Sequence, residues 1–218
     1  TTGLHVSREL LIKIAKLEIP VATEFLDTFT PQYIGDLISW GSIGARTVES
    51  QVHRQLVSGL SIPIGFKNST SGSISAALNS MKAAASSQAF YGINMVGKSC
   101  MIKTKGNDNT HIILRGSDNG PNYYLENVKE IPDNVKILID CSHGNSNKNH
   151  EKQKLVVDYY INNYINNFKF IGLMLESNII AGNQSIDTKP LKYGVSITDA
   201  CISWDDTKKI IIELYEKL

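Results

Sequence analysis

The stretch Lys136-Ile-Leu-Ile-Asp140-Cys-Ser-His143 decides the fold, because a short apolar run typical of a buried strand leads into a carboxylate and an imidazole. Five other short apolar runs also stop on a charged residue, at residues 21–24, 43–46, 62–67, 111–115 and 171–176. Helical patterns separate these runs. Strands that alternate with helices indicate an α/β fold in which crossover helices connect the strands of a parallel sheet.

The number of strand–helix units bears on how the sheet closes. A TIM (β/α)8 barrel carries its chemistry where its strands end, and six units are too few to complete it. Either the sheet is open or two units are missing. Residues 1–18 have a helical pattern that belongs after a strand, so we expect residues 1–218 to form a single barrel domain without its first two strands. Residues 90–105 predict a β-hairpin inserted before the strand at 111–115.

Local signals also predict where helices begin and end. Thr30 is expected to cap a helix that has Pro31 in its first turn. Ser73 is expected to cap a later helix, and Gly59 to end the helix before it.

Composition excludes several classes of protein. The chain has 218 residues, of which 42% are hydrophobic and 20% charged, and its net charge of +1 gives no electrostatic case for nucleic-acid binding. No apolar run approaches the ~20 residues that span a bilayer, so no membrane partner is expected. Three cysteines without CxxC spacing predict reduced thiols in a cytoplasmic protein.

Three cations stand at the ends of predicted strands, where we expect them to be buried: Arg46, Lys67 and Arg115. Side chains at these positions can bind a phosphate and a carboxylate together, with arginine donating bidentate hydrogen bonds. The alternative is that each cation forms a structural ion pair with Glu24 or Asp140. Taken as a set, the three positions favour a site for a phosphorylated anion.

A second group of side chains can ligate a metal. His143 follows one predicted strand, Glu176 ends the next, and Asp199 lies beyond the last strand. One imidazole and two carboxylates suit a divalent cation such as Mn, Fe, Co or Zn. The alternative for His143 is a histidine whose hydrogen bonds are satisfied inside the protein, and Cys201 remains a possible fourth ligand.

Nine motifs, spread over essentially the whole chain and in the right order, resemble one family. They are residues 40–47 (Trp-Gly-Ser-Ile-Gly-Ala-Arg-Thr), 49–53, 58–60, 65–68, 113–116, 140–148 (Asp-Cys-Ser-His-Gly-Asn-Ser-Asn-Lys), 176–177, 182–184 and 193–201. The family is the type I 3-deoxy-D-arabino-heptulosonate-7-phosphate (DAHP) synthases. The resemblance implies a (β/α)8 barrel, a divalent metal, and condensation of phosphoenolpyruvate with erythrose 4-phosphate at the start of the shikimate pathway.

The resemblance also assigns roles to individual residues. Phosphoenolpyruvate is expected at Glu24, Ala45, Arg46, Lys67 and Arg115. The metal is expected at His143, Glu176 and Asp199, with Lys67, Arg46 and His143 as the catalytic residues.

Two family motifs do not occur in this sequence: Pro-Cys-Ser-Ile, which carries a fourth metal ligand, and Lys-Pro-Arg-Thr, which binds erythrose 4-phosphate. Both belong to the first strands, so we expect the 218-residue chain alone to be inactive or badly impaired.

Feedback inhibition by an aromatic amino acid is implied as well. Pro31, Ser61, Phe90 and Gly92 stand at the effector positions, and the small Gly92 favours tyrosine. A homodimer or homotetramer is expected. Two alternatives stay open, a sister synthase that uses arabinose 5-phosphate and a non-catalytic effector-binding or assembly subunit. The hairpin and residues 196–201 argue against the sister synthase.

Overall fold

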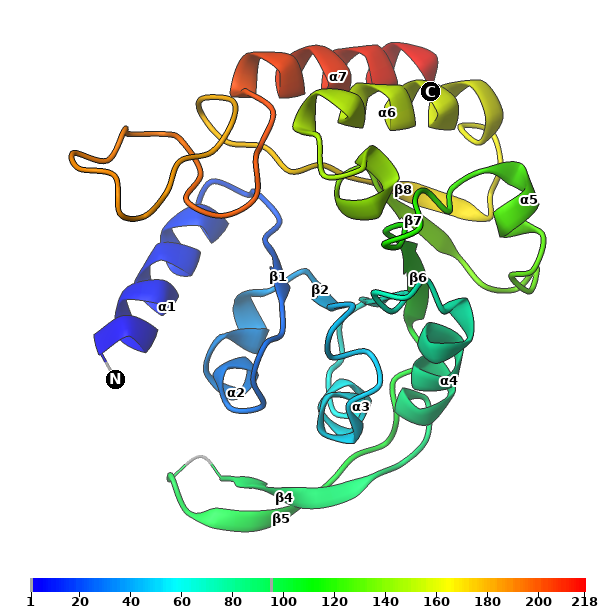
Figure 1. Cartoon of the computed structure of the whole chain (residues 1–218). Coiled ribbons are helices and arrows are strands. Elements are labelled where there is room, and N and C mark those ends of the chain that lie inside the picture. Colours follow the sequence, from blue (N-terminus) through cyan, green and yellow to red (C-terminus); the bar gives the residue numbers. More distant parts are fainter. Residues whose placement is uncertain (1, 95) are drawn as a thin grey trace. The chain divides into compact units, whose positions relative to one another are not determined.

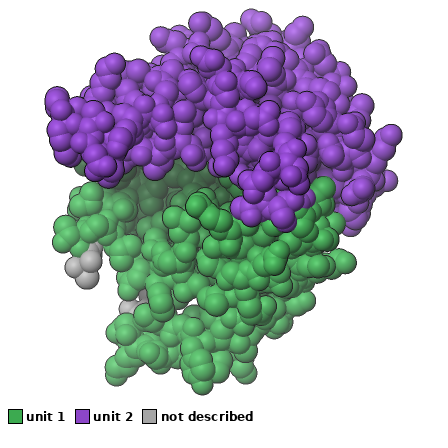
Figure 2. Space-filling model, in the orientation of Figure 1, with its two compact units in different colours: residues 1–69, 73–112 green, residues 70–72, 113–218 purple. Residues whose placement is uncertain are grey.

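The computed structural model describes residues 2–94 and 96–218, which form two compact units (Figures 1 and 2). Of the described residues, unit 1 comprises 2–69, 73–94 and 96–112, and unit 2 comprises 70–72 and 113–218. Strand β6 (Thr110–Leu114) is divided between them.

Unit 1 contains three parallel strands, their connecting helices and a hairpin. Its elements are α1 (Thr2–Ala15), β1 (Ala22–Glu24), α2 (Thr30–Ile34), η1 (Gly35–Leu37), β2 (Trp40–Ile43), α3 (Gln51–Ser58), β3 (Ile64–Lys67), α4 (Ile74–Ala84), β4 (Ala89–Ile93) and β5 (Ser99–Lys103).

Unit 2 contains two parallel strands and the C-terminal helices. Its elements are α5 (Leu125–Val128), β7 (Ile137–Asp140), η2 (His143–Ser146), η3 (His150–Lys152), α6 (Gln153–Asn163), β8 (Phe170–Met174) and α7 (Trp204–Lys217). Figure 1 shows α7, in red, beside α6.

The sheet has the strand order β1-β2-β3-β6-β7-β8. Strands β1, β2 and β3 pair in parallel, as do β7 and β8. Strands of such sheets are buried on both faces and therefore read as continuous apolar runs. Ile64 and Phe66 of β3 are fully buried, as are Ile137 and Ile139 of β7. The predicted α/β fold with a partial barrel of six parallel strands is confirmed.

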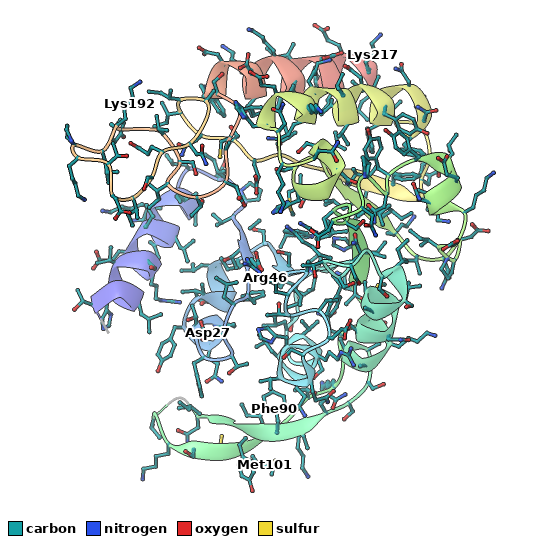
Figure 3. All side chains as sticks on the ribbon, viewed as in Figure 1. Asp27, Arg46, Phe90, Met101, Lys192 and Lys217 are labelled. Atoms are coloured by element: carbon teal, nitrogen blue, oxygen red, sulfur yellow. The ribbon has the colours of Figure 1, made fainter. Side chains whose placement is uncertain are left out.

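The inserted hairpin is also where the sequence places it. Strands β4 and β5 pair antiparallel, with Phe90 opposite Ile102 and Tyr91 opposite Met101. Tyr91 and Met101 are exposed, whereas Phe90 and Ile102 lie on the face directed toward α2 and α3 (Figure 3). The hairpin thus presents one apolar face to the rest of unit 1.

Two helix boundaries follow the sequence signals and one differs. Ser73 accepts a hydrogen bond from the Ala76 N–H, and Gly59 ends α3. The prediction that Thr30 caps α2 is wrong, because Thr30 is the first helical residue. The N-cap residue is Phe29, which makes no side-chain capping bond, and Asp27 further upstream accepts hydrogen bonds from the Thr30 N–H and hydroxyl at 2.8 and 2.6 Å. The Thr30 hydroxyl is thus a donor to Asp27, three residues before it.

Two predicted strand ends lie earlier than expected. Strand β2 ends at Ile43, so Arg46 stands in a turn three residues beyond it, and β8 ends at Met174, two residues before Glu176. None of the helices in the described residues is long and apolar enough to cross a membrane.

Candidate active site

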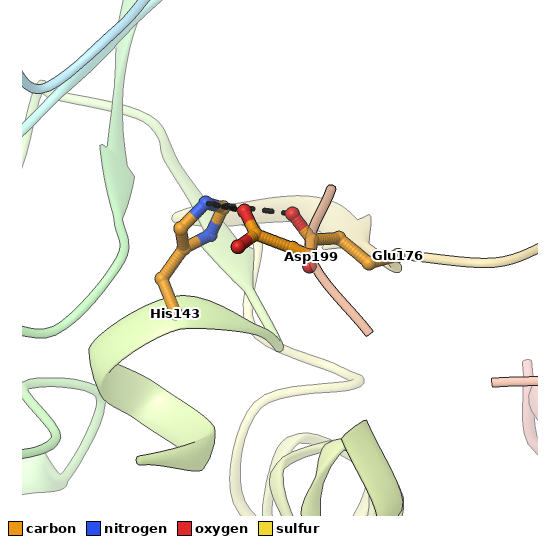
Figure 4. Close-up of side chains that lie close together, drawn as sticks. All are labelled: His143, Glu176 and Asp199. Atoms are coloured by element: carbon orange, nitrogen blue, oxygen red, sulfur yellow. Dashed lines mark ion pairs between the residues drawn. The ribbon is translucent and has the colours of Figure 1, made fainter. Parts of the chain in front are cut away.

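Three side chains of unit 2 form a candidate metal group (Figure 4). His143 Nε2 lies 3.4 Å from Glu176 Oε1 and 3.9 Å from Asp199 Oδ2. One ligand atom of each residue lies within 4.8 Å of the other two. One nitrogen and two carboxylate oxygens at this spacing suit a divalent transition metal, so the residues present fit the cation that the sequence predicts.

The end of β7 positions the imidazole. Asp140 is the last residue of β7 and is fully buried, and its Oδ2 lies 2.9 Å from His143 Nδ1. A carboxylate facing Nδ1 favours the tautomer with the proton on Nδ1, which leaves the Nε2 lone pair for a metal. His143 begins η2 with a positive φ of 52°, so a strained backbone aims the ring.

Neighbouring side chains hold the carboxylate of Glu176 in place. Ser142 Oγ donates a hydrogen bond to Glu176 Oε2 at 2.7 Å, which leaves Oε1 toward His143. Burial raises the pKa of the Glu176 carboxyl above its ordinary value, although the Ser142 hydroxyl and His143 act in the opposite direction. A cation beside the carboxylate would offset that burial cost.

Asp199 supplies the most exposed group, with a side chain 74% accessible. Cys201, two residues further on, is outside the three-residue group found among the described residues. Its backbone pairs with Gly182, and burial raises the pKa of its thiol. The possible fourth ligand at Cys201 therefore gains no support from the geometry.

Arg115 lies in the same unit, and its backbone is tied to the segment after His143. The Arg115 carbonyl accepts a hydrogen bond from the Asn145 N–H at 3.3 Å, and Asn145 Nδ2 donates to the carbonyls of Leu114 and Asp140 at 2.9 and 2.8 Å. The side chain of Arg115 is only 7% exposed. Unit 2 thus places a buried arginine directly after the end of β6, with its backbone bonded to the segment that follows His143.

Unit 1 holds the other predicted substrate residues. Glu24, at the end of β1, lies against Gly44, where an added Cβ would overlap its carboxylate. The turn that carries Ala45 and Arg46 starts directly after this contact. Arg46 is exposed, contrary to the expectation of buried strand-end cations, because β2 ends before it. Lys67, the last residue of β3, is buried as expected.

The predicted effector residues line two adjoining cavities of unit 1. Pro31, Ser61 and Phe90 line a cavity of about 460 Å³ between the hairpin, α2 and the end of α3. Phe90 and Gly92 line a second cavity of about 360 Å³. Both volumes lie in the range of small-molecule sites. An added Cβ at Gly92 would collide with Ile102, so this position has no space for a side chain unless Ile102 moves.

The polar residues that hold these groups are not among the site residues predicted from the sequence. Ser142 and Asn145 belong to the Asp140–Lys148 motif, which is the signal that could have singled them out. Gln153 stands in no motif, although its fully buried side chain bonds to Glu176. A hydrogen bond to distant backbone leaves no pattern in a sequence.

A partial (β/α) barrel with a histidine–carboxylate group past its strand ends defines the class: a barrel protein with a candidate divalent-metal centre. The family model described as "DAHP synthetase I family" matches residues 3–211. The chain belongs to this family.

Curated relatives agree with this membership. The chain is 46% identical over 226 residues to the Tyr-sensitive phospho-2-dehydro-3-deoxyheptonate aldolase of Escherichia coli, which covers 99% of this chain and 63% of the relative. It is 45% identical over 221 residues to the Phe-sensitive enzyme of the same organism, covering 97% and 63%. The chain therefore spans just under two thirds of the length of these relatives.

A solved structure is similar to this chain in both fold and sequence. The phospho-2-dehydro-3-deoxyheptonate aldolase of Francisella tularensis matches with a TM-score of 0.95 and 46% identity, over 99% of this chain and 65% of that chain.

Proposed function

We propose that this protein is a DAHP synthase, which condenses phosphoenolpyruvate with erythrose 4-phosphate to DAHP and phosphate in a metal-dependent reaction. The observation that carries the proposal is the convergence of His143, Glu176 and Asp199 in a chain of this family. The names of the relatives support the same reaction class.

For phosphoenolpyruvate we propose the side chains and backbone of Glu24, Ala45, Arg46, Lys67 and Arg115. The burial of Lys67 and Arg115 supports this choice, because a buried cation interacts strongly with an anionic substrate. Arginine adds bidentate recognition of phosphate or carboxylate.

The proposed reaction forms one carbon–carbon bond and one carbon–oxygen bond, the latter from water, and breaks the carbon–oxygen bond to the phosphate. The methylene carbon of phosphoenolpyruvate attacks the aldehyde carbon, water adds to the other end of the double bond, and phosphate leaves with its bridging oxygen. A divalent cation supplies Lewis-acid polarisation of the aldehyde oxygen. Arg46, Lys67 and Arg115 bind the phosphate and carboxylate and offset developing charge, while His143 or Asp199 moves protons.

The test starts with the expressed gene product. Phosphate release should require both substrates and a divalent cation, and Arg46→Ala should raise the KM for phosphoenolpyruvate by about tenfold or more, as expected for loss of a charge-assisted contact. An unchanged KM would contradict the role of Arg46.

Manganese titration then separates an enzyme from a non-catalytic subunit. Stoichiometric binding supports the enzyme, and no binding supports the subunit.

For the effector we propose tyrosine, bound in the cavity lined by Pro31, Ser61 and Phe90, with Gly92 beside it. The relatives include both Tyr-sensitive and Phe-sensitive enzymes at nearly equal identity, so identity does not decide the effector. Isothermal titration of the expressed protein with both amino acids tests it. Tighter binding of phenylalanine would overturn the assignment.

A cytoplasmic homodimer or homotetramer completes the proposal. The three cysteines are free in the structure, as expected for a reducing compartment. Light scattering on the purified protein measures the oligomeric state, and a monomer would contradict it.

A further inference from the structure

Gln153 holds Glu176 by its backbone. Gln153 is the first residue of α6, and its side chain is completely buried. Its Oε1 accepts a hydrogen bond from the Glu176 N–H at 2.9 Å, and its Nε2 donates to the Glu176 carbonyl at 3.0 Å. One side-chain amide therefore satisfies both polar groups of one backbone residue, as an adjacent strand would.

The same backbone residue joins all three segments that carry candidate ligands. The Glu176 carbonyl also accepts a hydrogen bond from the Ile202 N–H at 3.0 Å, and Ile202 lies three residues after Asp199. Gln153 itself follows the η2 and η3 turns, the first of which begins at His143. Gln153 thus connects the His143 segment to the point where the Glu176 and Asp199 segments meet.

This connection is needed because Glu176 lies beyond its strand. Strand β8 ends at Met174, so the regular strand pairing with β7 stops before the ligand. A fully buried amide that makes two hydrogen bonds to one residue restrains that peptide in one place, and without it the Glu176 N–H loses this partner while the carbonyl keeps the bond from the Ile202 N–H. Ser142 fixes the carboxylate end of the same residue.

We propose that Gln153 is a positioning residue for the metal centre, which holds the Glu176 backbone so that its carboxylate meets His143 and Asp199 at ligating distance. The inference rests on the proposed function, because it takes these three residues as the metal site. Partners that orient metal ligands typically contribute 10–100-fold to metal affinity.

The experiment uses Gln153→Met, which keeps the side-chain length and removes both hydrogen-bonding groups. The dissociation constant for Mn²⁺ alone is measured from the paramagnetic resonance signal of the free ion. We expect binding about 10–100-fold weaker than in wild type. Without metal, the Glu176 N–H should also exchange faster with deuterium.

The matched control is Tyr164→Phe, at the other end of α6. It removes another buried hydrogen bond to backbone, from the Tyr164 hydroxyl to the Tyr123 carbonyl at 2.7 Å. This variant should lose stability and keep wild-type Mn²⁺ affinity. An equal loss of affinity in Tyr164→Phe would show that Gln153 acts only through general stability and would overturn the proposal.

The remaining outcomes separate this inference from the proposed function. If wild type binds no Mn²⁺, or His143→Ala binds as well as wild type, the metal site itself is wrong. If binding depends on His143 and Gln153→Met binds as wild type does, only the role of Gln153 is refuted. Should Gln153→Met not fold, Gln153→Glu carries the same test, because it keeps the acceptor for the Glu176 N–H and loses the donor. Wild-type affinity in that variant would likewise refute the role.

Discussion

His143, the candidate metal ligand, has a left-handed backbone conformation with φ at 52°. This conformation costs an L-residue about 1–2 kcal/mol, and glycine has none of that steric cost because it lacks a Cβ. His143 is therefore a strained residue in the candidate metal site. Backbone strain of this kind clusters at functional sites.

This strain predicts a difference in stability between two variants that both remove the metal-ligating imidazole. His143→Gly should be more stable to unfolding than His143→Ala by about 1 kcal/mol, since only glycine relieves the left-handed strain. Urea unfolding at neutral pH measures the difference, and both variants should lose Mn²⁺ binding. Equal stabilities, or a more stable alanine variant, would show that the backbone at this position is not strained.

The buried His111 should make the stability of the folded protein sensitive to acid. It is 4% exposed, accepts a hydrogen bond from Trp40 Nε1 at 3.1 Å, and burial lowers its pKa from 6.5 to about 4. A lowered folded-state pKa gives stability that is complete above pH 6.5 and is lost as the pH falls toward 4. This group alone should remove about 3 kcal/mol between these limits.

The variant His111→Gln keeps a hydrogen-bond acceptor and cannot titrate. Its free energy of unfolding should fall less between pH 7 and pH 4 than that of wild type, by about 3 kcal/mol. Replacing the exposed His5 by glutamine is the matched control and should leave the acid loss at the wild-type value. The idea fails if His111→Gln loses as much stability in acid as wild type.

At the scale of elements, two glycines let the end of β6 approach the turn after β7. Gly116 has φ at 72°, and an added Cβ on Gly144 would overlap the backbone of Ser117 and Gly116. This contact sets Arg115, just before Gly116, beside the segment that begins at His143. Because the overlapping atoms belong to the backbone, no side-chain rotation can relieve the overlap.

Gly144→Ala should therefore lower the free energy of unfolding by about 2 kcal/mol, the range of overpacked substitutions. Gly35→Ala is the control, since an added Cβ there meets nothing within 4 Å, and it should change stability by less than about 0.5 kcal/mol. Thermal unfolding of both variants measures the contrast. Similar midpoints for the two would mean that the β6 end and the turn do not pack this closely.

How far the sequence predicts the structure depends on where each signal resides. The strands are readable because parallel strands buried on both faces are continuous apolar runs, as in Ile137–Asp140. The Ser73 cap is readable because its partner lies three residues away. The cap of α2 is predicted wrongly at Thr30, because Thr30 is already helical and the carboxylate that bonds to its N–H belongs to Asp27, three residues before it. Gln153 could not be found, since its partner is backbone 23 residues away.

At the scale of the whole molecule, the chain covers 63% of the Tyr-sensitive relative from Escherichia coli, yet one candidate site is contained within unit 2 alone. Its three ligands come from segments that lie far apart in the sequence. A cation that binds them together binds the folded chain and not the unfolded one. Metal binding and folding of unit 2 should therefore be linked.

The linkage predicts that Mn²⁺ raises the free energy of unfolding, by about 2.7 kcal/mol when its concentration is 100 times the dissociation constant. The effect should shrink as the pH falls. Protons compete for the ligands, and the raised pKa of the Glu176 carboxyl makes this competition begin at a higher pH than for an ordinary glutamate. Thermal unfolding with and without Mn²⁺, repeated across the acid range, measures both effects.

Asp199→Asn isolates the ligand from the fold. The Asp199 side chain is 74% exposed, so the substitution should change the metal-free stability by less than about 0.5 kcal/mol. The loss of one anionic ligand should remove most of the Mn²⁺-dependent gain, because a neutral amide oxygen is a weaker donor than a carboxylate. A full gain in Asp199→Asn would place the bound cation elsewhere in the protein and would remove the basis for a centre built from His143, Glu176 and Asp199.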